Sequence, residues 1–563
     1  MYKHLLLILI ALCSSGMASA DSEFVQSGIA YKVVADNIVD VIAQKDKKCC
    51  YQTFKDSILT VPSCIIHENK EYKVKCIEKT AFSTWCGMKR VVISNGIEEI
   101  QDKAFAGCAN LESVYIPSSV KSIGTENIFA FCFSLTEITV DDGNTVFDSR
   151  NGCNAIIKTV DNSLLCACKS TLIPSTVEKI NSYAYTGLQV TSIGIPNGVK
   201  TISEYAVCQC KQLEQITISS SVESIAPRAF DQCDNVKSVS VDKNNKYYDS
   251  RNNCNAIIED KEMLIWGCST TKIPSGVVEI GESAFAWCGT LREITIPEGV
   301  EYINRDAFTG CSALKVVKLP STLVGFEGFS HFIYCTSLDS IYIPQNVKKI
   351  PSDIFAGCTS LTRIIVDKRN VWYDSRNDCN AIIHSSDNSL IAGGKGSTIV
   401  EGVRSIAENA FLMSGVTSIH IPASVEYIDS TAFRKSENCK AITVDRGNAK
   451  YKSDGSNSIV ERATNKMILA CSTTKILPEV TSIGGYAYLN TSANVILPSG
   501  IKEIGNRAFA DCKDLCSIFI PSTVKHIGRF AFIGCKYLSD VVLMGNDLVI
   551  DKQAFEGCDL IKK

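Results

Sequence analysis

Cysteine is the residue type with the widest chemical scope in this sequence, which holds 27 cysteines in 563 residues. Thiols can pair as disulfides, bind metal ions or act as nucleophiles. Nine of them share one position of a recurring pattern, after a phenylalanine and before the next leucine or apolar residue: Cys108, Cys233, Cys288, Cys311, Cys335, Cys358, Cys512, Cys535 and Cys558. That position faces a crowded interior, where free cysteine behaves as a small apolar residue. We therefore expect these thiols to be buried and reduced, although stacked neighbours could come within disulfide distance.

Four cysteines that precede the first repeat and break the pattern are better candidates for disulfides, namely Cys49, Cys50, Cys64 and Cys76. Metal binding is not expected, because Cys166 and Cys168, like Cys208 and Cys210, are too closely spaced to form a C-x-x-C pair. The six histidines are scattered and form no H-E-x-x-H motif. The sequence predicts no metal site.

Acidic residues recur at one kind of position, in D-S-R-N segments that contain Asp148, Asp249 and Asp374. Asparagines nearby make calcium an alternative. However, each segment also carries an arginine, and Asp and Asn side chains commonly close turns by hydrogen bonding to the backbone. The turn is the favoured interpretation.

Catalysis has no motif to support it. The sequence contains no G-x-S-x-G elbow, no phosphate-binding glycine loop, and no serine, cysteine or carboxylate pair that stands apart from the recurring pattern. We predict no catalytic residues, no cofactor and no enzymatic activity.

The elements that position these residues are internal repeats. Isoleucines such as Ile280 and Ile303 lie 23 residues apart. The residues between them follow a pattern that recurs along the chain, in the order Ala-Phe, Cys, Leu, Ile-Pro and Val. Within one unit, Leu111, Val114 and Ile116 place apolar side chains on one face of a short strand, with Tyr115 on the other. A single unit cannot bury such a set, but stacked units share one core. The repeats predict a β-rich solenoid of about 17 turns.

Four units are longer and carry a second recurring segment. The segment beginning at Asp249 continues as Ala256–Ile258, a polar turn and Met263–Ile265, which is typical of a β-hairpin. Related segments follow Asp148 and Asp374, and a diverged copy follows Tyr451. The solenoid is therefore expected to contain four long repeats that each bear a β-hairpin.

The N-terminal residues predict export. Lys3 and His4 precede the apolar run Leu5–Leu12, and small residues at 18–20 provide a cleavage site, so residues 1–20 are predicted to be a signal peptide. Lipidation at Cys13 is the competing interpretation. Residues 21–76 contain strand-like segments outside the repeat and are predicted to be an N-terminal β cap, followed by the solenoid at 77–563. No later segment is apolar enough to be a transmembrane helix.

The A-F-x-x-C-x-x-L-x-x-I-x-I-P-x-x-V-x-x-I unit, seen for example from Ala284 to Ile303, resembles the BspA-like leucine-rich repeats of bacterial surface proteins. The D-S-R-N-x-C-N-A-I-I segment is similar to versions found in Bacteroidetes. The resemblance implies a right-handed solenoid, classed as α/β but rich in β-structure, and a secreted or cell-surface protein that adheres to host or matrix proteins or to other bacteria. It implies no catalytic residues. The sequence carries no recognisable sorting domain or membrane anchor, so the mode of attachment is left open.

Binding is expected on the outward positions of the four-residue strands, here called the strand face, where Tyr115, Tyr342 and Phe519 are candidate contacts for a protein or glycan ligand. The alternative is that these residues are only good strand formers. A net charge of −3 without a basic cluster argues against nucleic acid as a partner. The alternative function is a structural surface component that assembles through its C-terminal coil, a candidate site of self-association.

Overall fold

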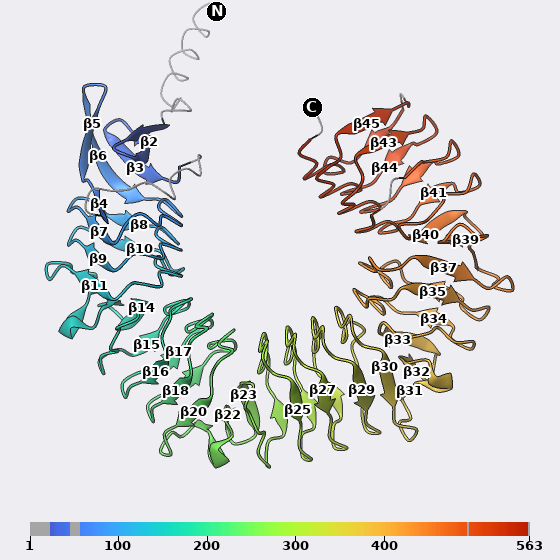
Figure 1. Ribbon diagram of the computed structural model, residues 1–563, viewed down its shortest axis with the longest axis horizontal. Coiled ribbons are helices and arrows are strands. Elements are labelled where there is room, and N and C mark those ends of the chain that lie inside the picture. Colours follow the sequence, from blue (N-terminus) through green and yellow to red (C-terminus); the bar gives the residue numbers. More distant parts are fainter. Residues whose placement is uncertain (1–22, 45–56, 493–494, 546, 561–563) are drawn as a thin grey trace, which may run out of the picture. The chain divides into compact units, whose positions relative to one another are not determined.

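The computed structural model describes residues 23–44, 57–492, 495–545 and 547–560, and it divides into two compact units, Met1–Asp249 and Ser250–Lys563. Both units are built from short strands joined by tight turns, which succeed one another coil by coil in Figure 1. Regular helix in the described residues is limited to short 3-10 turns, including η3 (Arg150–Gly152), η4 (Arg251–Asn253) and η5 (Arg376–Asp378). The fold is thus a β-rich solenoid, as predicted.

The first unit contains two series of parallel strands. Its strands are β1 (Glu23–Gln26), β2 (Ile29–Ala35), β3 (Ile38–Ile42), β4 (Ile58–Val61), β5 (Cys64–His67), β6 (Lys70–Ile77), β7 (Arg90–Ile93), β8 (Glu99–Ile100), β9 (Ser113–Ile116), β10 (Ser122–Ile123), β11 (Glu137–Val140), β12 (Phe147–Asp148), β13 (Ala155–Lys158), β14 (Ser163–Ala167), β15 (Lys179–Ile180), β16 (Ser192–Ile195), β17 (Thr201–Ile202), β18 (Gln215–Ile218), β19 (Ser224–Ile225), β20 (Ser238–Val241) and β21 (Tyr248–Asp249). Ile77, Ile100 and Ile123 are register partners on β6, β8 and β10, so the 23-residue spacing of isoleucines produces one rung per repeat. The four-residue strands β7, β9 and β11 form the second series.

The second unit repeats this arrangement. Its strands are β22 (Ala256–Glu259), β23 (Met263–Gly267), β24 (Glu279–Ile280), β25 (Glu293–Thr295), β26 (Tyr302–Ile303), β27 (Val316–Lys318), β28 (Gly325–Phe326), β29 (Ser340–Ile343), β30 (Arg363–Val366), β31 (Tyr373–Asp374), β32 (Ala381–His384), β33 (Ser389–Gly393), β34 (Ser405–Ile406), β35 (Ser418–Ile421), β36 (Tyr427–Ile428), β37 (Ala441–Val444), β38 (Tyr451–Lys452), β39 (Ser458–Glu461), β40 (Lys466–Ala470), β41 (Ser482–Ile483), β42 (Glu503–Ile504), β43 (Ser517–Ile520), β44 (His526–Ile527), β45 (Asp540–Leu543) and β46 (Val549–Ile550). Strands β24, β26 and β28 belong to the two-residue series, and β25, β27, β29 and β30, of three or four residues each, belong to the second series.

Each predicted hairpin is present, and each adds a rung to the solenoid. In the first insert β13 pairs antiparallel with both β12 and β14, and β14 then pairs in parallel with β15. The same change of direction occurs at β23, β33 and β40. Strand β3, before the first repeat, also joins its series by pairing in parallel with β6. For this reason the structure has about 21 turns, more than the 17 expected from the repeats alone.

The residues before the first repeat form strands β1 to β6. Strands β1, β2 and β3 pair antiparallel, and β5 pairs antiparallel with β6. This antiparallel arrangement differs from the parallel rungs that come after it. The predicted signal peptide, residues 1–20, and Cys13 lie outside the described residues.

The core of each unit contains a ladder of phenylalanines, one from each Ala-Phe turn. In the second unit the rings of Phe285 and Phe308 lie 5.2 Å apart, and those of Phe308 and Phe332 5.3 Å apart, with interplanar angles of 8° and 6°. All three side chains are almost completely buried. Offset aromatic contacts of this kind contribute beyond the area that they bury. Neighbouring repeats are therefore joined through their cores as well as by strand pairing.

The cysteines of the recurring position are buried as expected, except that Cys558 is only partly buried, and their thiols are free. They are also hydrogen-bond donors. The Sγ of Cys311 lies 3.0 Å from the carbonyl oxygen of Phe285, and the Sγ of Cys335 lies 3.2 Å from that of Phe308. These two thiols thus bond to carbonyls of the preceding Ala-Phe turns.

The disulfides considered for the N-terminal cysteines are not formed at the described positions. Cys64 is exposed and Cys76 is buried, and both thiols are free. The two lie on adjacent antiparallel strands, but Cys64 is paired with Lys73 rather than with Cys76. Cys49 and Cys50 lie outside the described residues.

Candidate binding surface beside the hairpin inserts

The strand face presents its predicted residues at alternating positions. Tyr342 lies on β29 between the buried Ile341 and Ile343, and its side chain is 46% exposed. Phe519, on β43, follows the same alternation and is 51% exposed, whereas Tyr115, on β9, is partly buried. Tyr115 belongs to the first unit, and Tyr342 and Phe519 lie in different sheets of the second. Each of the three residues is therefore described in its own surroundings.

Tyr342 is held in place by an acidic residue that follows the neighbouring strand. Its hydroxyl donates a hydrogen bond of 2.6 Å to Oδ2 of Asp367, just after β30. Nη2 of Arg369 donates to the same oxygen at 2.8 Å, and Nε of Arg369 donates to Oδ1 at 3.1 Å. Arg369 and Tyr342 together hold the pKa of the Asp367 carboxyl far below its usual range, while the shared proton raises the pKa of Tyr342. The result is a fixed tyrosine–carboxylate–guanidinium group.

Tyr115 has the corresponding partner in the first unit. Its hydroxyl donates to Oδ2 of Asp141, and the backbone N–H of Gly143 donates to Oδ1 of the same carboxylate at 2.9 Å. These bonds lower the pKa of Asp141, and the bond to the carboxylate raises the pKa of Tyr115. Both tyrosines thus stand one strand before a hairpin insert, and both are oriented by the aspartate that begins it.

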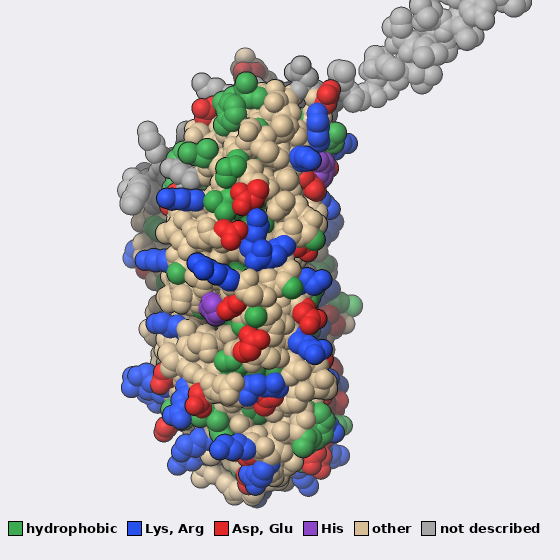
Figure 2. Space-filling model, turned by 90° about the vertical axis from the view of Figure 1, so that its right-hand side faces the viewer, with side chains coloured by type: hydrophobic (Ala, Val, Ile, Leu, Met, Phe, Trp, Pro, Cys, Tyr) green, Lys and Arg blue, Asp and Glu red, His purple; other side chains and the backbone are tan. Residues whose placement is uncertain are grey.

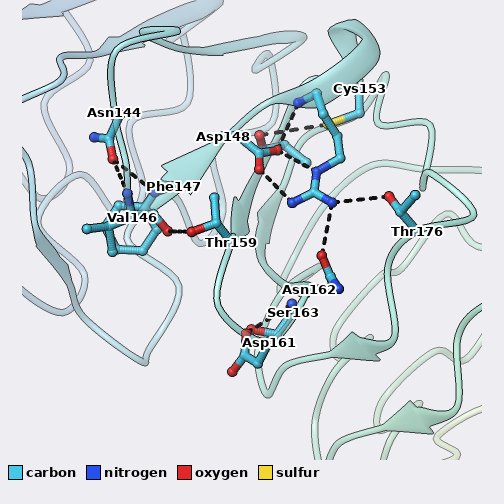
Figure 3. A network of polar contacts seen from close by, with 12 residues as sticks. Asn144, Val146, Phe147, Asp148, Cys153, Thr159, Asp161, Asn162, Ser163 and Thr176 are labelled. Carbon is cyan, nitrogen blue, oxygen red and sulfur yellow. Dashed lines mark hydrogen bonds and ion pairs between the residues drawn. The ribbon is translucent and has the colours of Figure 1, made fainter.

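An asparagine, buried in three of the inserts and partly buried in the second, connects each insert to the repeat before it. In the first insert Nδ2 of Asn144 donates at 2.9 Å to the carbonyls of both Pro117 and Val120, and its Oδ1 accepts from the N–H groups of Val146 and Phe147. Figure 3 shows the bonds to Val146 and Phe147. The same bonds recur at Asn245, Asn370 and Asn448. All of the amide's main hydrogen-bonding groups are used, which fixes the insert relative to its repeat.

The D-S-R-N segment closes on itself. Asp148 accepts bonds from Nε of Arg150 at 2.8 Å and from Nη2 at 2.6 Å, while Nη1 reaches Oδ1 of Asn162 at 3.0 Å and Oγ1 of Thr176 at 3.3 Å (Figure 3). Asp374 and Arg376 repeat the paired contact in the second unit. Asp148 and Asp374, two of the carboxylates that suggested calcium, are thus turn-closing groups bonded to arginine.

In the second unit Tyr342, the residues that follow β30 and the D-S-R-N segment of the third insert surround a hollow. It has a volume of about 790 Å³, and its lining includes Tyr342, Lys368, Arg369, Arg376 and Asn377. The Arg369 side chain is 73% exposed although it is bonded to Asp367, whose side chain is 8% exposed. The hollow therefore offers a fixed aromatic ring and an oriented guanidinium group to a ligand, and it is within the size range of ligand sites in proteins.

Phe519 has different surroundings. Its register partner on β45 is Val542, which is also exposed, and no hairpin insert follows these strands in the described residues. Alternation along the strand predicted that Phe519 would be exposed, but the aspartate and the insert are what distinguish Tyr115 and Tyr342. Sequence reasoning missed Arg369 and Asn370, although the recurrence of Asp, two residues and Asn before each D-S-R-N segment was a detectable signal.

Charges of both signs are mixed on the surface. Basic and acidic side chains lie interspersed over the face drawn in Figure 2. Ion pairs join residues one repeat apart, such as Lys89 with Glu112 at 2.8 Å and Lys237 with Glu214 at 2.6 Å. Over the described ranges, no helix combines the length and the hydropathy that a membrane crossing requires.

Comparison with known proteins places the repeats in a family. The model of the BspA type leucine rich repeat region matches in six copies, over residues 52–163, 162–262, 265–376, 395–476 and 457–563. A search of curated sequences gave no match.

Among solved structures, a leucine rich cell surface protein from Faecalibacterium prausnitzii is 19% identical, with 94% of this chain and 96% of that chain covered and a TM-score of 0.33. The pneumococcal vaccine antigen PcpA is 18% identical, with 76% and 94% covered and a TM-score of 0.34. A leucine-rich repeat protein from Eubacterium ventriosum is 18% identical, with 91% and 95% covered and a TM-score of 0.34. With the family model matching well over half of its residues, the chain belongs to the BspA type leucine rich repeat family.

Proposed function

We propose that this protein is a secreted or cell-surface binding protein, adhesin-like in its role, that engages host or matrix proteins or glycans through its solenoid surface. In this proposal residues 1–20 are a signal peptide, residues 21–76 an N-terminal cap and residues 77–563 the binding solenoid. The contact is non-catalytic. Tyr342, at the hollow beside the third insert, is the main contact residue, with Tyr115 and Phe519 as further contacts.

The observation that carries the proposal is the exposed but fixed pair of Tyr342 and Arg369. Tyrosine and arginine are the residue types that most often dominate binding energy at protein interfaces. Both side chains here are already held by Asp367, so less conformational freedom is lost when a ligand binds. An unanchored surface tyrosine would not have this advantage.

The test begins with the mature chain, residues 21–563, used to capture extracellular-matrix and cell-surface proteins. The affinity of each captured protein is then measured for Tyr342→Ala and Arg369→Ala. We expect each variant to weaken binding by about tenfold or more, which corresponds to about 1.4 kcal/mol.

The matched control is Tyr427→Ala. Tyr427 is 57% exposed and its hydroxyl also contacts an aspartate, Asp429, at 3.3 Å, but it lies on β36 in the two-residue series. Binding that is unchanged in both test variants, or weakened equally by the control, would exclude the hollow as the contact site. Failure to capture any protein or glycan would remove the main support for an adhesin-like role.

A second candidate function, self-association of a structural surface component, is favoured by the last described coil. Val542, Leu543, Val549 and Ile550 are exposed on β45 and β46. Exposed apolar strands can pair with other chains. Light scattering at increasing protein concentration tests this. An assembled species that grows with concentration and is abolished by Val542→Lys would support self-association. A constant monomer mass would exclude it.

A further inference from the structure

A second hollow lies in the first unit, on the tight turns rather than on the strand face. Its volume is about 280 Å³, at the small end of the range for ligand pockets. It spans successive coils, and its lining includes Phe131, Tyr183, Tyr205, Gln209, Arg228 and Gln232. None of these residues belongs to the strand-face site, so a ligand in this hollow would bind independently of the proposed adhesin-like contact.

Three lining residues of this hollow, here called the turn pocket, form a stack of planar groups. The rings of Tyr183 and Tyr205 lie 5.4 Å apart at an interplanar angle of 6°. The guanidinium carbon of Arg228 lies 4.9 Å from the centroid of the Tyr205 ring. Successive coils thus supply one planar side chain each, and the stack fixes their orientation.

The backbone at these positions is left-handed. Tyr183, Tyr205 and Arg228 have φ values of 65°, 56° and 60°. The same conformation recurs at this turn position in other repeats, for example at Ser283, Arg507 and Phe530, so it belongs to the repeat and does not by itself mark a site. Phe131 has φ 61°, and its ring covers Gly187 so closely that a Cβ there would lie 2.2 Å from Cδ1 of Phe131. Glycine is therefore needed at 187 to admit the ring.

The floor of the turn pocket is polar and buried. Thr186, Cys208 and Asp231 contribute to it, and each is less than a tenth exposed. Asp231 receives bonds from Nη2 of Arg228 at 3.3 Å and from Nε2 of Gln232 at 3.4 Å. Burial raises the pKa of its carboxyl, an effect that Arg228 opposes.

The charges of the lining cancel. Arg228 pairs with Asp231, and Lys103, also in the lining, pairs with Glu126 at 2.6 Å. Two cations and two carboxylates therefore leave no formal charge to attract an ion. What remains are aromatic surfaces, amides, hydroxyls and an oriented guanidinium group, which suit a neutral molecule that has both C–H faces and many hydroxyl groups.

We propose that the turn pocket is a binding site for a neutral saccharide of one or two sugar rings. The rings of Phe131 and Tyr183 contact the C–H groups of the sugar, because the Tyr205 ring is already covered by Tyr183 and Arg228. The amides of Gln209 and Gln232 and the guanidinium group of Arg228 hydrogen-bond with its hydroxyls. Because the pocket is open along several coils, it accepts a terminal sugar of a longer glycan.

The experiment uses the mature chain on an array of neutral and charged glycans, followed by calorimetry with the neutral glycan that binds best. The test variant is Gln209→Asn with Gln232→Asn. Both positions have left-handed φ values, which asparagine tolerates, so the backbone is preserved while the amides are withdrawn. We expect at least one neutral glycan to bind, and we expect the double variant to weaken the affinity for that glycan by about tenfold or more. Tyr427→Ala, on the second unit, should leave it unchanged.

A second variant, Gly187→Ala, displaces the Phe131 ring. It should weaken the affinity for the same glycan, while the circular dichroism spectrum stays that of the native protein. The proposal is overturned if no neutral glycan binds at millimolar concentration, if only charged glycans or cationic peptides are retained, or if the double variant binds as the parent does. Loss of protein capture through Tyr342→Ala with saccharide binding intact would separate the two sites.

Discussion

The hydroxyl of Tyr342 and the carboxylate of Asp367 share a 2.6 Å hydrogen bond that joins a strand-face residue to the first turn of a hairpin insert. The exposed ring is therefore positioned by the insert as well as by its own strand. The equivalent bond of Tyr115 to Asp141 shows that the arrangement recurs at the first insert. The long repeats thus have a role in orienting side chains on the neighbouring plain repeat.

Removing the Tyr342 hydroxyl should be visible in the titration of Asp367. Arg369 and the hydroxyl both lower the pKa of this carboxyl, so Tyr342→Phe should raise it, and Arg369→Ala should raise it further. Carbon-13 NMR of the Asp367 carboxyl between pH 2 and 6 measures the change. Tyr427→Phe, which removes a bond to Asp429, serves as the control. An unchanged Asp367 titration in both test variants would mean that the bonds are not formed in solution.

The buried asparagine of the third insert should make a large contribution to stability. Nδ2 of Asn370 donates to the carbonyls of Pro344 at 3.0 Å and Val347 at 2.8 Å, and its Oδ1 accepts two backbone bonds of 2.9 Å. Asn370→Ala leaves these groups unpaired, so we expect the free energy of unfolding to fall by about 2–4 kcal/mol.

Urea unfolding followed by circular dichroism measures this loss. The control is Asn346→Ala, because Asn346 makes one exposed bond of 2.8 Å to the carbonyl of Ser321 and should contribute less than about 1 kcal/mol. Equal losses for the two variants would show that the asparagine does not fix the insert.

His331 should make the second unit less stable in mild acid. Its side chain is fully buried, Nε2 lies 3.1 Å and 3.0 Å from the carbonyls of Ile303 and Glu327, and Nδ1 has no hydrogen-bond partner among the described residues. Burial lowers the pKa of His331 to about 4. The unfolded chain therefore takes up this proton first, and stability falls as the pH drops from about 6.5 to about 4, by about 3 kcal/mol in all.

Chemical denaturation at several pH values tests the effect. His331→Gln cannot titrate, so it should lose this part of the pH dependence, whereas His384→Gln should retain it because His384 is more exposed and contacts Asp387. Parallel curves for the parent and His331→Gln would contradict the assignment.

The sequence was sufficient to predict the repeating parts of the fold, because in each part apolar residues that must be buried recur at a fixed spacing. The isoleucines of the two-residue strands, the phenylalanine ladder and the buried cysteines all follow from the 23-residue spacing. The turn number was underestimated because the extra rungs of the inserts, such as β14 with Leu164, lack the isoleucine that marks the other rungs. Pairing across an insert depends on tertiary contacts that the repeat does not encode.

The turn conformations were less accessible to prediction. Trp287 has φ 60°, and a Cβ at Gly310 would lie 2.4 Å from its ring, so the tryptophan requires a glycine one repeat later. A bulky aromatic residue gives no local signal for a left-handed conformation. The turn pocket was missed for the same reason, since Tyr183, Tyr205 and Arg228 resemble ordinary repeat variation in the sequence.

The thiols should divide into two classes in the native protein. Cys64, Cys86 and Cys516 are exposed, while cysteines of the recurring position such as Cys311 and Cys335 are buried, and burial raises the pKa of Cys335 well above its usual value. Thiolates rather than thiols react with alkylating reagents. Iodoacetamide followed by peptide mass spectrometry should therefore modify the exposed class in native protein and the buried class only after denaturation. A disulfide-linked peptide pair containing Cys311 and Cys335 would contradict the reduced, hydrogen-bonded state.

Hydrogen–deuterium exchange of the mature chain with and without a captured ligand tests the proposed binding role most directly. If the hollow beside the third insert is the contact site, exchange should slow over residues 340–378, and Tyr342→Ala together with Arg369→Ala should abolish the protection. Protection confined to the residues around Phe519 would contradict this role for the hollow. So would protection confined to coils that are distant from both the first and the third insert.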